Sequence, residues 1–140
     1  MPCEFLIDTD RRLVISRGTD TFRYGDFLEH MKVLAADPRY NPDFDHLVDC
    51  RKFDRFDVTP EQIQDMGSQS VFAAKSRRAF VVSSALHFGM GRMFANYRDV
   101  RRGQLTVVFR EVRGATDWLG LPQDYDPSSL GEPTQIAGNS

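Results

Sequence analysis

The chain has 140 residues, a length typical of one domain with its own hydrophobic core. Its 18 Lys and Arg residues are spread among 20 Asp and Glu residues, so the net charge of −2 gives no field that would attract nucleic acid. We expect no membrane span, because no apolar run approaches the roughly twenty residues that a spanning helix needs. We also expect no signal peptide, because nothing at the N-terminus resembles one. Two cysteines, Cys3 and Cys50, lie in apolar runs, which indicates reduced thiols and a cytoplasmic location.

The first part of the chain predicts a hairpin followed by a helix. Two apolar runs at 3–8 and 12–16 flank a short polar turn, a pattern typical of two antiparallel strands. Apolar residues then recur every three or four positions from Tyr24 to Ala35. This spacing predicts a helix that ends before the Asp37–Pro38 pair, since the residue before a proline disfavours helical geometry.

The middle of the chain predicts two strands with a capped helix between them. The first strand is 46–50, and the helix begins at Thr59, whose hydroxyl is placed to accept the Gln62 N–H while Gln62 reaches back as the capping-box partner. We expect this helix to extend to about Lys75. The nearly continuous apolar run at 78–84 predicts a central strand that is covered on both faces.

The last part of the chain completes an α/β pattern. A helix within 83–100, a strand at 104–110 and a short helix at 114–119 follow, and the composition then changes to Pro, Gly, Ser and Asp. We predict one domain at 1–121 and a mobile tail at 122–140. The fold class is a single mixed five-stranded sheet, an N-terminal antiparallel hairpin followed by parallel β-α-β units, with about four helices.

Several motifs resemble those of the SpoIIAA-like family of small bacterial proteins, which are related to STAS domains. They span roughly Phe5 to Leu119 and read "DPRYNPDFDHLVD", "TPEQI", "RAFVV", "GMGRMF", "LTVVFR" and "ATDWL". The resemblance implies the fold more than an activity. STAS domains are regulatory interaction modules, and a nucleotide or a lipid is the kind of ligand that the resemblance suggests.

The resemblance also raises Thr59 as a regulatory position. The STAS anti-sigma antagonists carry a phosphorylatable serine in an Asp-Ser-Ser-Gly motif at the start of the corresponding helix, whereas this chain has "DVTPEQ" there. The motif is missing, and a helix cap is the simpler explanation of Thr59, because caps stabilise helices by about 1 kcal/mol without any further role.

A candidate anion site follows from the predicted topology. In parallel sheets, ligands gather beyond the carboxyl ends of the strands, where helix N-termini attract negative charge. A phosphate or carboxylate would meet polar side chains from two adjacent strand ends and the next helix: Arg51, Ser83, Ser84, His87 and Arg92. In the alternative interpretation, one serine caps the helix, His87 is solvated, and the arginines pair with Asp49, Asp54 or Asp57.

Two further features have open interpretations. Phe53 and Phe56 in "KFDRFD" either fold back onto the core or line an opening or an interface. The "GMGR" segment is not a dinucleotide-binding fingerprint, because Phe94 stands where the third glycine belongs and the glycines lie inside a helix. We interpret Gly89 and Gly91 as packing positions, within a subunit or between subunits.

The sequence predicts no metal site and no cofactor. His30, His46 and His87 lack the spacing of zinc ligands. His46 and Cys50 lie about 13 Å apart along a regular strand, which is too far for a catalytic dyad, so Cys50 is interpreted as a buried, inert thiol.

The leading hypothesis is a non-enzymatic binding or regulatory module of STAS-like type. It would bind a small anionic or lipid-like, amphipathic ligand or a protein partner at the loops after the third and fourth strands. The alternatives are a self-associating scaffold, for example a homodimer that uses "GMGRMF", and, least favoured, an enzyme that uses the Asp49, Asp54 and Asp57 carboxylates or Cys50. The site requires Cys50 and Ser83 to end adjacent parallel strands.

Overall fold

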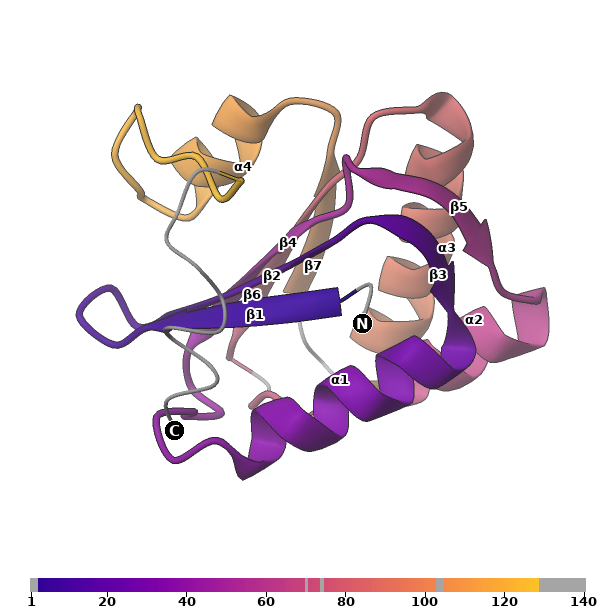
Figure 1. The fold of residues 1–140 in the computed structure, drawn as a ribbon, viewed down its shortest axis with the longest axis horizontal. Coiled ribbons are helices and arrows are strands. Elements are labelled where there is room, and N and C mark those ends of the chain that lie inside the picture. Colours follow the sequence, from indigo (N-terminus) through magenta and orange to yellow (C-terminus); the bar gives the residue numbers. More distant parts are fainter. Residues whose placement is uncertain (1–2, 70, 74, 103–104, 129–140) are drawn as a thin grey trace.

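The protein is described by a computed structural model that covers residues 3–69, 71–73, 75–102 and 105–128. Strands and helices alternate along most of the chain (Figure 1). The elements in chain order are β1 (Cys3–Asp8), β2 (Leu13–Gly18), β3 (Asp20–Arg23), α1 (Tyr24–Ala36), β4 (Asp45–Asp49), β5 (Phe53–Asp57), α2 (Pro60–Ser68), β6 (Arg77–Val81), α3 (Ala85–Arg102), β7 (Leu105–Phe109) and α4 (Val112–Trp118).

The main sheet has five strands in the order β1-β2-β4-β6-β7. β1 and β2 form the expected antiparallel hairpin, and the other neighbouring strands run parallel, which confirms the predicted mixed sheet. β4 and β6 are adjacent and parallel, with Asp49 opposite Val81, so the segments after Cys50 and Val82 meet at one edge as predicted. β4 is the middle strand, and β6, which was expected to be central, lies one place further along.

A second, two-stranded sheet was not expected from the sequence. β3 pairs in parallel with β5, so the "KFDRFD" segment is a strand and the prediction of a loop there is wrong. The rings of Phe22, Phe53 and Phe56 contact one another with centroids 5.2–5.4 Å apart. These contacts hold β3 against β5. The small sheet is joined to the main domain through Phe53, which is buried in one cluster with Cys50 and Val82.

Helix α2 is shorter than predicted, because it ends at Ser68 and not near Lys75. The chain leaves the helix so that Phe72, which is buried, stacks on the ring of His46 with centroids 4.6 Å apart. The Ala73 N–H also donates to the carbonyl oxygen of Pro42. These contacts hold residues 71–73 against the sheet. If α2 continued to Lys75, the same residues would lie on the helix and could not make these contacts.

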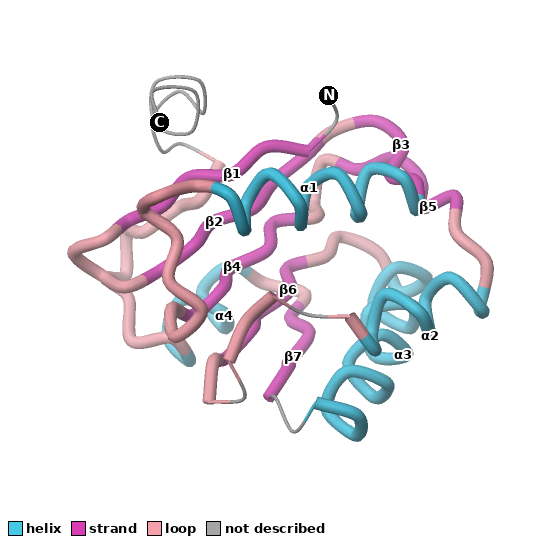
Figure 2. Tube along the Cα trace, turned by 90° about the horizontal axis from the view of Figure 1, so that it is seen from below, coloured by secondary structure: helices cyan, strands magenta, loops and turns pink. Residues whose placement is uncertain are grey.

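Helices cover the two faces of the main sheet unequally (Figures 1 and 2). On the first face, which we call the α4 face, Leu13, Ile15, Leu47, Ala79 and Val81 pack against Ala115 and Leu119, the latter just beyond the end of α4. On the opposite face, side chains of the same strands meet α1, α2 and α3, as in the cluster of Phe27, Ile63, Met66 and Phe94 with Phe80.

The segment 122–128 lies on the α4 side of the sheet. Tyr125 belongs to the α4-face core, Pro127 is fully buried, and Arg17 donates through Nη1 to the Pro127 carbonyl oxygen. This part of the expected tail therefore packs on the domain, whereas 129–140 lies outside the described residues. Within the part of the chain that the structure describes, no helix is long and apolar enough to cross a membrane.

Candidate functional site

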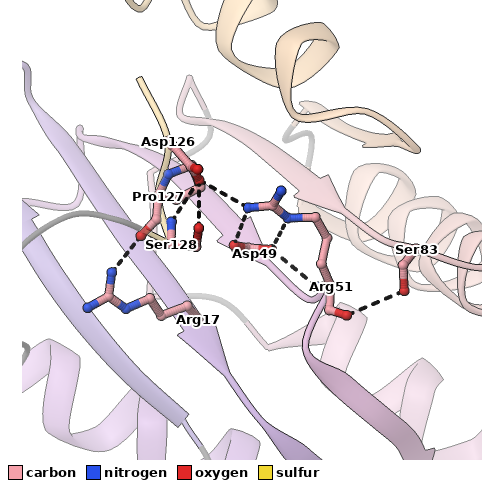
Figure 3. A network of polar contacts seen from close by, with 7 residues as sticks. All are labelled: Arg17, Asp49, Arg51, Ser83, Asp126, Pro127 and Ser128. Carbon is pink, nitrogen blue, oxygen red and sulfur yellow. Dashed lines mark hydrogen bonds and ion pairs between the residues drawn. The ribbon is translucent and has the colours of Figure 1, made fainter. Parts of the chain in front are cut away.

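Arg51, the predicted anion-binding residue, is engaged by the protein's own carboxylates (Figure 3). Its Nε donates to Asp49 Oδ1 over 2.8 Å, and its Nη2 donates to Asp49 Oδ2 over 2.9 Å and to Asp126 Oδ1 over 3.2 Å. The side-chain hydrogen bond to Asp49 is the main reason why the pKa of Arg51 is raised. The alternative interpretation, in which Arg51 pairs with Asp49, therefore describes the observed contacts.

The other polar residues of the predicted anion site also have local roles. The Ser83 hydroxyl donates to the Arg51 carbonyl oxygen over 3.4 Å, and Ser84 Oγ accepts the His87 N–H over 3.1 Å, which caps the start of α3. Arg92 is exposed, with its guanidinium 6.0 Å from the ring centre of Phe88. The structure thus brings Ser83 beside the Arg51 backbone, but it does not gather the predicted side chains around one point.

Thr59 forms the predicted capping box with Gln62. Its hydroxyl accepts the Gln62 N–H over 3.1 Å, and its own N–H donates to Gln62 Oε1 over 2.9 Å. The observed contacts account for a threonine here as a structural feature of α2.

A cavity of about 110 Å³ lies between the sheet and the three helices. We call the sheet side chains that form its floor the cavity face: Ser16, His46, Val48, Arg78, Phe80 and Val82. Three residues of the predicted site line this cavity, namely Phe53, Phe56 and His87. The other predicted members, Arg51, Ser83, Ser84 and Arg92, do not line it, and neither does Thr59.

The walls of the cavity are apolar and rich in aromatic rings. α2 contributes Ile63 and Met66, and α3 contributes Met90 and Phe94. The ring of Phe94 meets Phe80 edge to face, with centroids 5.2 Å apart. Flexible methionine side chains next to fixed rings make a surface that adapts to the shape of an apolar molecule.

Polar groups gather at one end of the cavity. Ser16 Oγ lies 2.7 Å from His30 Nε2 and 2.7 Å from His46 Nε2. Because a hydroxyl carries a single hydrogen, one imidazole accepts it while the other donates an N–H to the same oxygen. Burial, with a smaller effect of the Arg78 charge, lowers the pKa of His30 to about 4, so His30 is neutral near pH 7.

Arg78 is the cation at this end of the cavity. It is only 2% exposed although it lies on an interior strand, and its guanidinium carbon is 5.4–5.8 Å from the ring centres of Phe72, Phe80 and Phe94. Sequence reasoning missed this residue. The signal was the alternation of a strand, which places Arg78 on the same side of β6 as Phe80 and Val82.

His87 occupies a different part of the cavity wall. Its ring meets the ring of Phe56 edge to face, with centroids 4.6 Å apart. The imidazole is buried, contrary to the solvated histidine of the alternative interpretation, and its Nδ1 has no hydrogen-bond partner among the described residues. A buried nitrogen of this kind is available to a bound molecule with a complementary polar group.

Both cysteines also line the cavity and are free thiols. Burial is the main cause that raises the pKa of Cys3 to about 12, and it also raises the pKa of Cys50. Neither side chain is a thiolate near pH 7, so neither has the protonation state that a nucleophile needs.

No model of a protein family matches the chain, and no curated protein matches it. Among solved structures, the chain is similar to an uncharacterised protein of the DUF3478 family, with a SpoIIAA-like fold, from Shewanella loihica PV-4. The TM-score is 0.50 at 17% sequence identity, over 76% of this chain and 83% of that chain. The chain therefore has a SpoIIAA-like fold, as the sequence resemblance implied.

Proposed function

We propose that this protein is a cytoplasmic, non-enzymatic binding module that holds a small amphipathic ligand in the cavity between the sheet and the three helices. The cavity itself carries the proposal. Protein interiors are normally close-packed, and voids larger than a water molecule are few. A space of about 110 Å³ inside a small domain is therefore unusual.

The size of the cavity favours a small ligand. An engineered cavity of about 150 Å³ lined by apolar side chains binds benzene, so a space of this order takes a single ring or a short branched chain. The rings of Phe22, Phe53 and Phe56 would contact the apolar part of such a ligand, and the polar end near Ser16 and Arg78 would contact its polar part. Phe22 and Phe56 are only partly buried, so we place the entrance at the small sheet.

The SpoIIAA-like fold favours a regulatory role, in which ligand binding would control contact with a protein partner. β5 and α3 both line the cavity and both lie at the surface, since Arg55 and Leu86 are exposed. A ligand in the cavity would therefore contact the inner side of elements whose outer side is open to a protein partner.

Thermal unfolding in the presence of toluene or indole tests the proposal. Either probe should raise the melting temperature of the wild type, because it binds the folded state alone. Val48→Phe, which fills the cavity from the sheet, should abolish the rise. Val33→Phe adds the same ring at an exposed position of α1 and should leave the rise intact. A wild type that neither probe stabilises would refute the proposal.

Self-association is a second candidate, supported by the outer surface of α3. Leu86 is 72% exposed and Met93 is 37% exposed, and seven residues place them two turns apart on the same side of the helix. Sedimentation at micromolar concentration should show a dimer that Leu86→Glu dissociates. A wild-type monomer would exclude this candidate.

A further inference from the structure

We propose that the ligand carries a neutral hydroxyl group that hydrogen-bonds to His87 Nδ1, as in a short branched alcohol or a phenol. This inference rests on the proposed function, because it names the chemical class of the molecule that the same cavity takes. The polar end near Ser16 supplies one polar contact, and His87 supplies a second from a different part of the wall. Three observations support the inference: the buried nitrogen, the fixed position of its ring and the size of the cavity.

One ring nitrogen of His87 is buried without a partner. His87 is 9% exposed and lines the cavity, and its Nδ1 has no hydrogen-bond partner among the described residues. A buried polar atom that has lost its hydrogen bonds to water destabilises the fold unless a new partner replaces them, and such atoms are rare in native proteins. A phenylalanine here would keep the ring contact with Phe56 without that cost. A ligand that pairs with Nδ1 therefore explains a histidine at this position.

The imidazole of His87 is held in a fixed position, so its nitrogen offers a directed contact. His87 lies in the first turn of α3, where its backbone N–H donates to Ser84 Oγ over 3.1 Å. Its ring meets the ring of Phe56 edge to face with centroids 4.6 Å apart, and Phe56 in turn packs on Phe53 with centroids 5.2 Å apart. Phe53 and Phe56 also line the cavity, so a ligand that packs on these two rings lies beside the imidazole.

A hydroxyl group fits Nδ1 better than other polar groups do. In a neutral imidazole one nitrogen donates and the other accepts, and the tautomer decides which role Nδ1 has. A hydroxyl both donates and accepts, so it pairs with Nδ1 in either tautomer, whereas a carbonyl oxygen only accepts. A charged group would lose its hydration against the rings of Phe53 and Phe56. The contact therefore selects a neutral alcohol or phenol.

The size of the cavity limits the ligand to a compact molecule. The volume is about 110 Å³, which is less than the roughly 150 Å³ of an engineered cavity that holds benzene. The flexible side chains of Met66 and Met90 line the same space and can adjust to a ring. Phenol and toluene have the same number of non-hydrogen atoms, so they require the same space and differ only in the group that would face His87. This pair of probes therefore separates the hydrogen bond from the effect of size.

Calorimetric titration with phenol and toluene tests the inference. The wild type should bind both probes. His87→Phe keeps a ring against Phe56 and removes the nitrogen, so the affinity for phenol relative to toluene should fall about tenfold, or about 1.4 kcal/mol, the size of one hydrogen bond. The ratio of the two dissociation constants cancels the effect of the larger phenylalanine ring on the space in the cavity. An unchanged ratio would overturn the inference.

His30→Gln is the matched control, because it alters a histidine at the other polar contact of the cavity. It should leave the ratio of the two dissociation constants within about twofold of the wild-type value, as expected for a site that does not touch the hydroxyl. If His30→Gln lowers the relative affinity for phenol and His87→Phe does not, the hydroxyl binds near Ser16 and the inference is overturned.

The ¹⁵N resonance of His87 Nδ1 provides a second test, made on the wild type, that does not depend on the folding of a variant. Phenol should shift this resonance, because a hydrogen bond changes the electronic surroundings of the nitrogen. Toluene should leave the resonance nearly in place. An equal response to the two probes would overturn the contact between the hydroxyl and His87.

The outcomes separate this inference from the proposed function. If toluene or indole binds the wild type and phenol does not, or if phenol binds independently of His87, the hydroxyl assignment is overturned and the cavity remains a ligand site. If phenol, toluene and indole all fail to bind the wild type, both proposals are overturned.

Discussion

The two faces of the main sheet are built by the same strands and differ in their interiors. On the α4 face, Leu13, Ile15, Leu47, Ala79 and Val81 are at most 1% exposed and pack directly against the residues of α4. On the cavity face, the alternating positions include Ser16, His46 and Arg78, and a space remains above them. One face thus supplies the packing that stabilises the fold, and the other places polar groups where a ligand can reach them.

This difference illustrates the general trade-off between stability and function, in which residues that serve a binding site lower the stability of the fold. Polar and charged groups in an interior rarely stabilise a protein more than apolar groups of the same shape. Sites that bind ligands retain such groups at a cost in stability, and the rest of the molecule compensates. In this protein the compensation comes from the α4 face, so substitutions on the two faces should have unequal effects.

The largest effect is expected from Leu47→Ala on the α4 face. Leu47 is fully buried, so the truncation should lower the free energy of unfolding by about 2–5 kcal/mol. Ile63→Ala on α2 should cost less, because Ile63 already borders the cavity and loses fewer contacts. Urea unfolding of both variants measures the two values. An equal or larger cost for Ile63→Ala would contradict the distinction between the faces.

The next effect is a pH dependence that arises from the cavity face. The pKa of His30 is lowered from 6.5 to about 4 in the folded protein, so the unfolded chain takes up the proton first as the pH falls. Stability is therefore complete above pH 6.5 and declines as the pH falls towards 4, by about 3 kcal/mol in total. Urea unfolding at several pH values measures this decline.

His30→Gln is the control for this pH dependence. The glutamine keeps a polar partner for Ser16 and cannot be protonated, so the decline between pH 6.5 and 4 should become shallower. Asp37 and Asp126 have lowered pKa values, chiefly through hydrogen bonds from Arg39 and Ser128, and both residues are still present in the variant. If the two profiles run parallel, His30 is not the group responsible.

Smaller effects of opposite sign are expected from one added methylene on each face. Val48→Ile extends into the cavity and should stabilise the protein by up to about 0.8 kcal/mol. Val81→Ile enlarges a fully buried residue of the α4 face and should destabilise it by about 1–3 kcal/mol. Thermal unfolding of the pair compares the space on the two faces, and destabilisation by Val48→Ile would show that the cavity face is already full.

The smallest effect is expected at the glycines of α3. A Cβ on Gly89 would meet nothing within 4 Å, so Gly89→Ala should stabilise the helix by up to about 1 kcal/mol and raise the melting temperature by about 3 °C. A Cβ on Gly91 would lie 3.1 Å from both methyl groups of Val108, which should offset that gain. Equal stabilisation by the two substitutions would contradict the close contact between α3 and β7.

Much of the fold was predictable because it depends on local patterns. The Thr59 capping box, the apolar spacing of α1 and the continuous apolar run of β6 each determine their element from neighbouring residues, and the adjacency of β4 and β6 was predicted correctly. The β3–β5 sheet was missed because its two strands are far apart in the sequence. Its pairing depends on contacts between Phe22 of β3 and Phe53 and Phe56 of β5, which no local pattern predicts.

The candidate site was predictable only in part. Phe53 and Phe56 were singled out as two phenylalanines in an expected loop, and His87 was predicted from its place near the strand ends. All three line the cavity. Arg51 was chosen for the same reason as His87, but Asp126, seventy-five residues later, lies beside its guanidinium. Arg78 escaped notice because a charge at the start of an apolar strand resembles a strand end. Arg78 lines the cavity because the helices that cover its face of the sheet do not fill the space above it, and this arrangement is not visible in the sequence.

The central claim is that the cavity face binds a ligand, and the methionine methyl groups test it most directly. Met31, Met66 and Met90 line the cavity, whereas Met93 lies on the outer surface of α3. In a protein labelled with ¹³C at the methionine methyl groups, titration with toluene should shift the signals of the first three and leave that of Met93 in place. A titration that moves the Met93 signal alone, or none of the four, would contradict the account.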